Sequence, residues 1–351
     1  MTTIYEHVQG ASLGTVLAGQ SIIDHPALSI HTLEEAQAFL ECYGYDLEID
    51  KKEIASLRLK ALKFLQNTLL DDSFPIPETI RNTEDIRHLL MWASNNHKSS
   101  RALWSCSLLR IMHTISHCSS FFNDHYQHEI RHQIVARIEK HITKDDAGRI
   151  FLGDIELADF QCRPCKTQES ATLKLLHKPE NVTADIFDWI GLRFITKYRL
   201  DAIKVLVFLR ENNAVMFANV KPSRSRNSLL DIEWMKKQFL DTNYEDLKLA
   251  LEEMDYPQEQ GKPIDNVHTT SNYHAVQFTC RQRINILGPR GHRINFFFPF
   301  EIQIMDQKSY HESRLGDASH EMYKRRQLET VRKRVLGKLY KKYVEHVQFS
   351  K

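Results

Sequence analysis

The chain lacks long hydrophobic runs and any large excess of charge. No eighteen consecutive residues are apolar among its 351, so we expect no membrane-spanning helix and no membrane partner. The start, Met1-Thr2-Thr3-Ile4, does not have the basic-then-apolar layout of a signal peptide, which favours a cytoplasmic protein. With a formal net charge of only +2, the whole molecule does not resemble a nucleic-acid coat protein. Any basic partner surface must therefore be local.

Cysteine is also sparse. The six cysteines are scattered at positions 42, 106, 118, 162, 165 and 280, and a chain of this length can bury a core without disulfides. We therefore expect reduced thiols. Cys162 and Cys165 form a lone CxxC pair with no second pair at zinc-finger spacing, which favours incidental cysteines over a zinc site. Internal repeats and low-complexity segments are absent from the sequence.

The first part of the chain has helical periodicity. Thr32-Leu33-Glu34-Glu35 has the form of a capping box. Apolar residues then recur at helical spacing, as at Ile54, Leu57 and Phe64. We expect helices as far as about residue 142 and a domain boundary at the turn 145–148. Residues 1–148 are thus predicted to be an all-helical N-terminal domain, with a regulatory or oligomerisation role assigned by elimination.

Residues 149–351 alternate between strand-like and helix-like patterns. This favours an α+β domain in which a mixed β-sheet is flanked by helices. The expected strands are 189–196, 214–220, 273–286 and 293–305, of which the last two form an antiparallel hairpin. The expected helices are 201–210, an insertion at 229–254, and a long closing helix that starts near residue 307.

Two of these strands each bring one carboxylate. Asp188 lies at the start of strand 189–196, and Glu301 lies in the sequence Phe300-Glu301-Ile302-Gln303-Ile304. Because side chains alternate along a strand, Glu301 and Gln303 share one face and the apolar residues share the other. Two acids on neighbouring strands can share a divalent metal such as Mg²⁺ that neutralises a polyphosphate, which points to nucleotide chemistry. The alternative is that both acids pair with surface lysines.

A polar stripe precedes Asp188. If residues 166–174 are helical, Lys166, Ser170 and Lys174 fall on one face at i, i+4 and i+8. Two ammonium groups and a hydroxyl suit a triphosphate, which needs dispersed cations as charge moves during transfer. The alternative is the solvated face of an amphipathic helix.

Histidines and basic residues elsewhere carry weaker signals. His113 and His117 are spaced i, i+4, but the residues around them read as core, and the histidines at 125, 128 and 132 read as an exposed helix face. From Lys324 to Lys342, nine basic residues stand against one acid. This segment could contact a polyanion such as RNA, or form the solvated face of a helix.

In combination, these motifs resemble the synthetase domain of RelA/SpoT-type alarmone synthetases. Residues Asp188 to Arg193, DWIGLR, are similar to that family's Asp-x-x-Gly-x-Arg strand, and residues 301–304, EIQI, to its Glu-x-Gln-Ile strand. Residues 316–324, GDASHEMYK, resemble its Gly-x-Ala-Ala-His-x-x-Tyr-Lys helix. The ordered set covers residues 160–326 and looks closest to a little-characterised bacterial side branch of the family.

The resemblance implies a nucleotidyltransferase-like fold that moves the β,γ-diphosphate of ATP to the 3′-hydroxyl of a guanosine nucleotide. It implies that Asp188 binds Mg²⁺ and that Glu301 lies by the attacking hydroxyl, where it can share the metal. Contacts to the ATP phosphates are implied for Arg163, Lys166, Ser170, Lys174 and Arg193. Contacts to the acceptor are implied for Tyr273, by stacking on the base, and for Gln303, His320 and Lys324.

The acceptor side departs from the family pattern. The family's Gln-Ser-Leu-His after the stacking tyrosine reads His274-Ala275-Val276-Gln277, and Met305 replaces the arginine after Glu-x-Gln-Ile. Arg163 lies one residue from the usual arginine position. The acceptor is therefore open between a guanosine nucleotide, an adenosine nucleotide and the 3′ end of a tRNA, and an inactive nucleotide-binding sensor is a further alternative.

The family's long members also carry a hydrolase domain marked by a His-Asp pair, and that dipeptide occurs nowhere in this sequence. We therefore do not expect the N-terminal helices to degrade alarmone. A homo-oligomer is compatible with the sequence.

Overall fold

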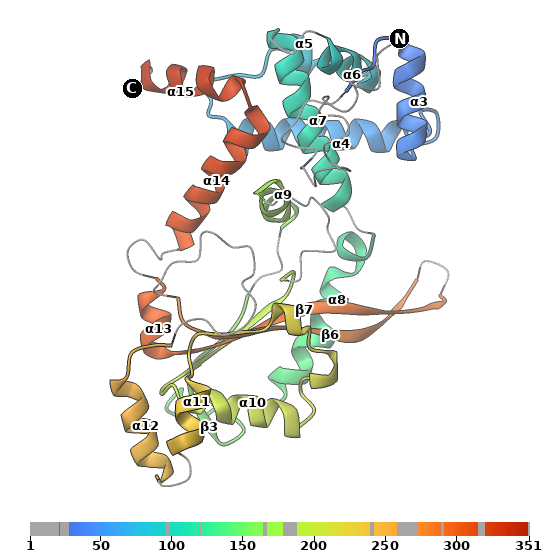
Figure 1. Ribbon diagram of the computed structural model, residues 1–351. Coiled ribbons are helices and arrows are strands. Elements are labelled where there is room, and N and C mark those ends of the chain that lie inside the picture. The colour runs from blue at the N-terminus through green and yellow to red at the C-terminus, as the bar shows by residue number, and fades with distance from the viewer. Residues whose placement is uncertain are drawn as a thin grey trace, which may run out of the picture. The chain divides into compact units, whose positions relative to one another are not determined.

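The computed structural model describes residues 21, 28–95, 99–118, 121–163, 167–177, 188–238, 242–257, 273–288, 291–314 and 320–349. The chain divides into two compact units that interleave along the sequence (Figure 1). Unit 1 comprises Met1–Ser120, Thr167–Asp185 and Arg325–Lys351, and unit 2 comprises Phe121–Lys166 and Ile186–Lys324. The sequence pattern suggested a single boundary after residue 148, so the two partitions differ. The predicted division into domains 1–148 and 149–351 stays a prediction.

The described part of unit 1 is helical. Its helices are α3 (Leu33–Tyr43), α4 (Lys51–Phe64), α5 (Glu78–Arg81), α6 (Ile86–Ser94), α7 (Ser100–Cys118), α9 (Gln168–His177), α15 (Leu339–Phe349) and most of α14 (His320–Leu336), with one π-helical turn, η2 (Leu65–Leu69), after α4. The predicted capping box starts α3, where Thr32 Oγ1 accepts from the Glu35 amide at 3.1 Å and Glu35 Oε2 accepts from the Thr32 amide at 3.3 Å. The expected helical N-terminal region is confirmed.

One apolar core holds helices of unit 1 that are far apart in sequence. It includes Leu108 of α7, Leu176 of α9 and Val335 of α14, all fully buried. Polar contacts support the same packing, because Arg110 Nη1 donates to the Val335 carbonyl at 2.9 Å and Arg334 Nη1 donates to the Leu176 carbonyl at 2.6 Å. Packing of this kind explains why α9 and the C-terminal helices belong with the N-terminal ones.

Unit 2 is built on a mixed seven-stranded sheet. Its strands are β1 (Ile142–Lys144), β2 (Ile150–Leu152), β3 (Ile155–Cys162), β4 (Gly191–Thr196), β5 (Arg226–Asn227), β6 (Val276–Leu287) and β7 (Arg293–Asp306). The strand order is β1-β2-β3-β4-β7-β6-β5. β4 and β7 pair in parallel, whereas the other neighbouring strands pair antiparallel. The predicted α+β class with a mixed sheet is confirmed, and the arrangement is consistent with the nucleotidyltransferase-like fold that was expected.

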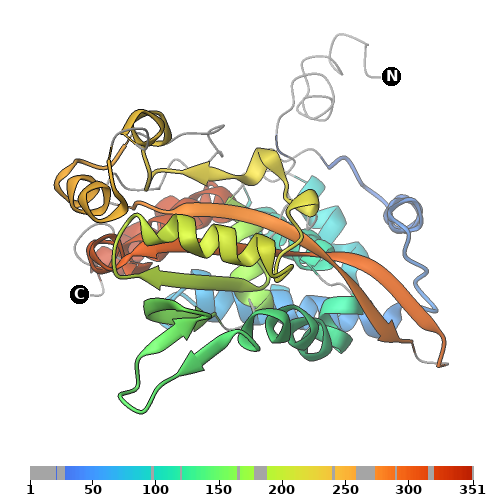
Figure 2. The ribbon, with the colours of Figure 1, turned by 90° about the horizontal axis from the view of Figure 1, so that it is seen from below.

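Helices flank this sheet. They are α8 (Phe121–Glu139), α10 (Asp201–Glu211), α11 (Ile232–Gln238), α12 (Tyr244–Glu253) and α13 (Gln307–Glu312). α10 packs against β3, β4 and β7 (Figure 2), while α8 packs against β6. α13 follows β7 directly and packs against β4 and β7, where Tyr310 shares a small apolar cluster with Ile195 and Met305. No helix in the described ranges is long and apolar enough to cross a membrane.

Two local expectations were wrong, and the turn expected to be a domain boundary lies inside unit 2. Residues 214–220 form no strand, because the chain turns through a 3₁₀ segment, η4 (Phe217–Asn219), and only Val220 forms a bridge, to Cys280. The turn 145–148 is not a boundary between the two units but the connection between β1 and β2, with Gly148 at φ +78°. The expected closing helix is broken, and Gly337 at φ +52° separates α14 from α15.

The register of the sheet sorts its side chains into two faces. Leu192 and Phe194 of β4 stand opposite Ile302 and Ile304 of β7, and all four are fully buried. The alternate residues of the same strands are Gly191, Arg193, Glu301 and Gln303, and the register brings Gln277 and Thr279 of β6 to the same face. One face of the central sheet is therefore apolar and the other is polar, as the strand alternation predicted.

Candidate active site

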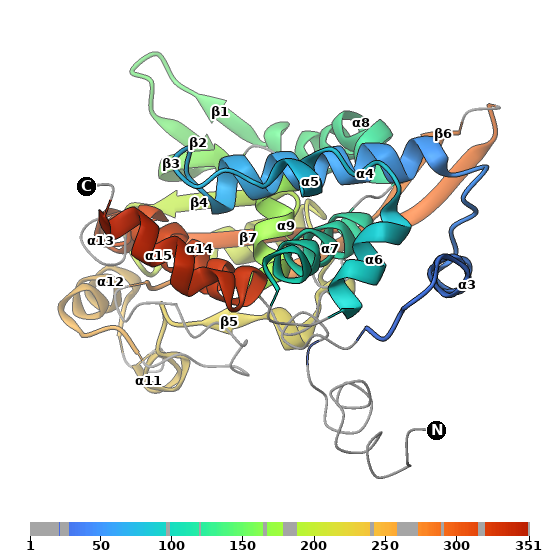
Figure 3. The ribbon, with the colours of Figure 1, turned by 90° about the horizontal axis from the view of Figure 1, so that it is seen from above.

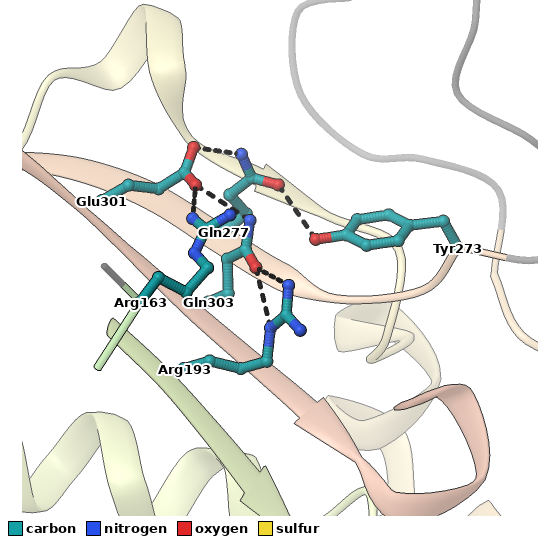
Figure 4. Close-up of polar contacts among 6 residues, drawn as sticks. All are labelled: Arg163, Arg193, Tyr273, Gln277, Glu301 and Gln303. Atoms are coloured by element: carbon teal, nitrogen blue, oxygen red, sulfur yellow. Dashed lines mark hydrogen bonds and ion pairs between the residues drawn. The ribbon is translucent and has the colours of Figure 1, made fainter. Parts of the chain in front are cut away.

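The polar face of the sheet in unit 2 gathers several of the predicted site residues. Glu301 lies at its centre, on β7, with Arg193 on β4 and Gln277 on β6 beside it (Figure 4). Arg163 follows the end of β3, where its amide donates to the Gly191 carbonyl at 2.9 Å and extends the β3–β4 pairing by one residue. Segments distant in sequence thus meet at one carboxylate.

Three donors hold the carboxylate of Glu301. Arg163 Nη2 lies 2.6 Å from Oε2, which also accepts from Gln303 Nε2 at 2.9 Å. Gln277 Nε2 donates to Oε1 at 2.5 Å. A carboxylate offers about four acceptor positions, and these three donors fill three of them. No donor from the described residues fills the fourth position, which is on Oε1. The Glu301 side chain is only 11% exposed, so this position is largely shielded from bulk water.

The guanidinium of Arg163 occupies the space above Gly191. A Cβ built on Gly191 would lie 2.4 Å from Arg163 Nη2 and 2.5 Å from its Nε. Burial disfavours the charge of Arg163, but the Glu301 carboxylate, together with Tyr273 and Asp188, outweighs burial and raises the pKa of Arg163 above its ordinary value. Glycine at position 191 is therefore what lets this arginine lie flat over β4 and reach Glu301.

A second layer of hydrogen bonds fixes the donors themselves. Arg193 donates to Gln303 Oε1 through Nε at 3.1 Å and Nη2 at 2.9 Å. The Tyr273 hydroxyl donates to Gln277 Oε1 at 3.4 Å. Burial, with the Glu301 carboxylate adding to it, raises the pKa of Tyr273, while burial lowers the pKa of Arg193. The side-chain oxygens of Gln303 and Gln277 therefore already accept hydrogen bonds. Each of these two amides can then direct only its NH₂ group toward Glu301.

Asp188 lies at the same end of the sheet. It precedes β4 by three positions, is half-buried, and acts electrostatically on Arg163, whose pKa it helps to raise. Next to it, the Ile190 carbonyl accepts from the Glu301 amide at 2.9 Å. The two predicted carboxylates are therefore linked through one arginine. That they face one cleft and share a metal stays a prediction.

The segment that carries Tyr273 is anchored by an aromatic pair. His274 stacks on Tyr256 with ring centroids 4.1 Å apart and planes 6° apart, and the Tyr256 hydroxyl donates to Asp306 at the end of β7. Arg199, only 1% exposed, places its guanidinium 4.3 Å from the centroid of the Tyr256 ring. His274, which replaces a residue of the family's acceptor motif, thus has a packing role.

Of the other residues predicted to make contacts, two belong to α9 of unit 1, one to α14, and the side chains of the rest lie outside the described residues. Ser170 and Lys174 are one turn apart on α9 of unit 1, both half-buried, so the predicted helix and shared face are confirmed for these two. Lys166 and the side chain of His320 lie outside the described residues. Lys324, on α14, is exposed. The phosphate and acceptor roles assigned to these four residues stay predictions.

The described histidines and cysteines that were weighed as metal ligands make hydrogen bonds to other side chains. The hydroxyl of Tyr43 lies 2.8 Å from His113 Nδ1 and 3.4 Å from His117 Nε2. Cys162 accepts from Arg131 Nη2 at 2.8 Å, whereas Cys165 lies outside the described residues. Within the described ranges, no three His, Cys, Asp or Glu side chains group as metal ligands.

The basic C-terminal segment is partly engaged in internal contacts. Arg332 Nε donates to the Leu69 carbonyl at 2.8 Å, and Arg334 bonds to the Leu176 carbonyl as described above. Lys333, Lys338 and Lys341 are exposed. RNA contact through this segment stays a prediction.

Gln277 belongs to the site although the sequence did not predict a role for it. In the sequence it appeared only as a departure from the family pattern, yet its amide binds Glu301 and accepts from Tyr273. The signal was available in the strand alternation. Tyr273 and Gln277 are four residues apart, and the even spacing places Gln277, Glu301 and Gln303 on one face once β6 and β7 are paired.

Comparison with known proteins gives little support beyond this geometry. No protein-family model matches the chain, and no curated protein matches it. Among solved structures, the chain is similar to a GTP pyrophosphokinase family protein from Streptococcus pneumoniae, with 14% sequence identity and a TM-score of 0.29. That likeness covers 64% of this chain and 90% of the other. At this identity and score it carries no argument about function.

Proposed function

We propose that the protein is a magnesium-dependent pyrophosphokinase that transfers the β,γ-diphosphate of ATP to a hydroxyl of a nucleotide, with the 3′-hydroxyl of a guanosine nucleotide as the first candidate. In this reaction the acceptor oxygen bonds to the β-phosphorus, the bond between that phosphorus and the α,β-bridging oxygen breaks, and AMP leaves. Such transfer is mainly positioning and charge neutralisation, and the residues around Glu301 suit both.

The observation that carries the proposal is the open acceptor position on Glu301 Oε1. A carboxylate that is held by Arg163, Gln277 and Gln303 is fixed in orientation, so a hydroxyl that donates to the remaining position would be oriented with it. Glu301 would then accept the proton as the hydroxyl attacks, a role worth about 10²- to 10⁴-fold in rate.

The residues present also fit a magnesium ion. Mg²⁺ in nucleotide sites can use a single carboxylate together with phosphate oxygens and water. Asp188, which acts electrostatically on Arg163, would supply it, because the last acceptor position on Glu301 is the one proposed for the hydroxyl. Bound there, the ion would neutralise the phosphate charge. Arg163 and Arg193 add two guanidinium groups on the same sheet face, where they would bind phosphate oxygens.

A nucleotide-binding sensor without activity is the second candidate. It is favoured by the same contacts, since three donors on one carboxylate would also serve as a purely structural link between β3, β6 and β7. In that case Glu301 holds strands together and has no proton to accept.

The test is incubation with γ-labelled ATP, Mg²⁺ and each candidate acceptor, followed by separation of products. We expect labelled acceptor and stoichiometric AMP with wild type. We expect a loss of about 10²- to 10⁴-fold with Glu301→Gln, and no loss with the control Glu233→Gln, which removes an exposed ion pair with Lys236. Nucleotide binding without transfer to any nucleotide or tRNA would favour the sensor.

A further inference from the structure

The hairpin of β6 and β7 extends far beyond the rest of the sheet. β4 pairs only with Glu301–Asp306 of β7, whereas β6 and β7 remain paired from Arg281↔Pro299 to Leu287↔Arg293. Figure 3 shows this two-stranded ribbon continuing past the other strands. We call the part formed by residues 281–287 and 293–299 the ribbon.

One face of the ribbon packs against the protein. Ile284, Ile286 and Phe298 are buried on this face. α8 closes the same side, because Gln133 Nε2 donates to the Asn285 carbonyl at 2.6 Å and the Gln133 carbonyl accepts from Gln282 Nε2 at 3.2 Å. The ribbon is therefore held in place and has one face left for solvent.

The other face is exposed, basic and aromatic. Its exposed residues are Arg281, Arg283, Asn285 and Leu287 of β6 and Arg293, Asn295 and Phe297 of β7. Leu287 is 60% and Phe297 52% exposed. Large apolar side chains this open are informative when they stand among charges of one sign, because such a mixture is typical of a binding surface.

The charge of this face is uncompensated within the described structure. From Val276 to Phe300 the sequence has four arginines and no Asp or Glu, although the whole chain is nearly neutral at +2. Arg281, Arg283 and Arg293 have no ion pair with any residue in the described ranges. The surface thus attracts a polyanion.

The geometry of the face selects the kind of polyanion. Residues on one face of a strand repeat every ~6.7 Å, so Arg281 and Arg283 form a row of cations along β6. Phe297 stands directly opposite Arg283, and the Arg281 guanidinium lies 5.8 Å from its ring centroid. An aromatic ring between two guanidinium groups offers stacking for a base and charge for the phosphates on either side.

We propose that this face of the ribbon binds single-stranded nucleic acid. Phosphates would lie along the arginine row, and a base would stack on Phe297. The alternation of β6 and β7 places these residues on the same sheet face as Gln277 and Glu301. The inference nevertheless does not depend on the proposed transfer, because it rests on the charge and exposure of the ribbon alone.

The test is fluorescence anisotropy of the full-length protein with labelled oligouridylate and oligothymidylate of about twelve nucleotides, over a range of salt concentrations. We expect the triple variant Arg281→Gln, Arg283→Gln, Arg293→Gln to bind at least tenfold more weakly than wild type. Its plot of log affinity against log salt should be shallower by about 2, since each neutralised phosphate contributes about 0.7 for single strands.

Phe297→Ala should weaken binding roughly 5- to 150-fold without changing the salt slope, because stacking is not an ionic contact. Glu301→Gln should bind as wild type does, which separates this proposal from the proposed transfer. The matched control neutralises Lys338, Lys341 and Lys342, three exposed lysines on and beside α15, and should bind normally. Far-UV circular dichroism of each variant checks that it is folded.

Binding of either RNA or DNA that depends on the arginines and Phe297 supports the proposal. No binding by folded wild type at about 50 mM salt overturns it, since electrostatic binding is strongest there. An equal loss of binding in the lysine variant would also overturn the proposal, because it would assign the binding to the C-terminal helices. Arginine-dependent binding to phosphatidylserine vesicles without binding to the oligonucleotides, or a dimer that Phe297→Ala abolishes in light scattering, would equally overturn it.

Discussion

Replacing Gly191 with alanine adds a methyl carbon that would lie 2.4 Å from Arg163 Nη2 and 2.8 Å from its Cζ. Real Cβ atoms do not approach that closely, so the guanidinium must move. The backbone conformation does not oppose the substitution, because Gly191 lies in regular strand β4 with no positive φ. The backbone is therefore expected to stay in place, and the whole effect falls on the contact between Arg163 and Glu301.

The expected destabilisation follows from the hydrogen bond that Glu301 loses when Arg163 moves away. A hydrogen bond to a charged group contributes about 1.5–3 kcal/mol, and a carboxylate that is 11% exposed is poorly compensated by water. The Arg163 side chain is 34% exposed, so screening places the loss toward the lower end. Alanine also favours a strand over glycine by about 0.5–1 kcal/mol. The net destabilisation expected for Gly191→Ala is about 1 kcal/mol.

Urea unfolding measures this change, with an unaltered m-value as the sign that only stability has changed. The decisive control is the same substitution in an Arg163→Met background, where there is no guanidinium to displace and Gly191→Ala should be neutral or slightly stabilising. The two effects must therefore be strongly non-additive. If Gly191→Ala costs the same in both backgrounds, or costs nothing in wild type, the described contact does not stabilise the protein.

Three further predictions concern other parts of the chain. Burial, with His117 nearby, lowers the pKa of His113 from 6.5 to about 4. As the pH falls, this histidine is therefore protonated in the unfolded chain before it is protonated in the folded one. The folded state loses stability as the pH falls below about 6.5. Wild type should lose about 2 kcal/mol between pH 7 and 5, and His113→Gln correspondingly less, in urea titrations. Arg199→Met leaves the carbonyls of residues 229, 251 and 254 without their charged donor and should lower the unfolding free energy by about 3 kcal/mol, whereas exposed Arg210→Met should not. Lys174→Ala should raise the apparent requirement for ATP more than that for the acceptor; equal ATP binding by wild type and the Lys166→Ala, Lys174→Ala variant would contradict the assigned role.

Much of the fold follows from local sequence patterns. Strand alternation and the turn between them predicted the β6–β7 hairpin, and a continuous buried strand followed by a helix predicted β4 and α10. The sheet face predicted for the Glu301 side chain was correct for the same reason. Side chains alternate along a strand, so burying the apolar residues on one face places Glu301 on the other.

The errors arise where a pattern has two physical solutions. Residues 214–220 form a short apolar run, and such a run cannot distinguish a strand from another buried segment. Ala214 and Val215 are indeed buried, but the chain reaches the sheet only at Val220. The break after α14 had a signal, Gly337, because an isolated glycine in a helical pattern often marks an end.

The division into two units could not be predicted from the sequence, for a different reason. It depends on which apolar helix faces meet, and Leu176 and Val335 could pack against many partners that have the same periodicity. Only the folded structure reveals that they join Leu108 in one core. The contacts of Arg163 were hidden in the same way, since its reach to Glu301 depends on a glycine on the adjacent strand.

Gln277 offers the sharpest test of acceptor choice, because it is both a departure from the family pattern and a direct partner of Glu301. A neutral histidine at this position could donate to Glu301 through one ring nitrogen and accept a hydrogen bond from the acceptor base at the other. It would give up only the long 3.4 Å contact from Tyr273, so Gln277→His should fold normally. It would restore the residue type of the family's acceptor motif. Buried hydrogen bonds discriminate between bases far more than stacking does. We therefore expect the variant to prefer GDP or GTP over adenosine nucleotides about tenfold more strongly than wild type in the labelled-ATP assay. An unchanged preference in an active, folded variant would mean that Gln277 serves Glu301 alone and that acceptor choice is made elsewhere.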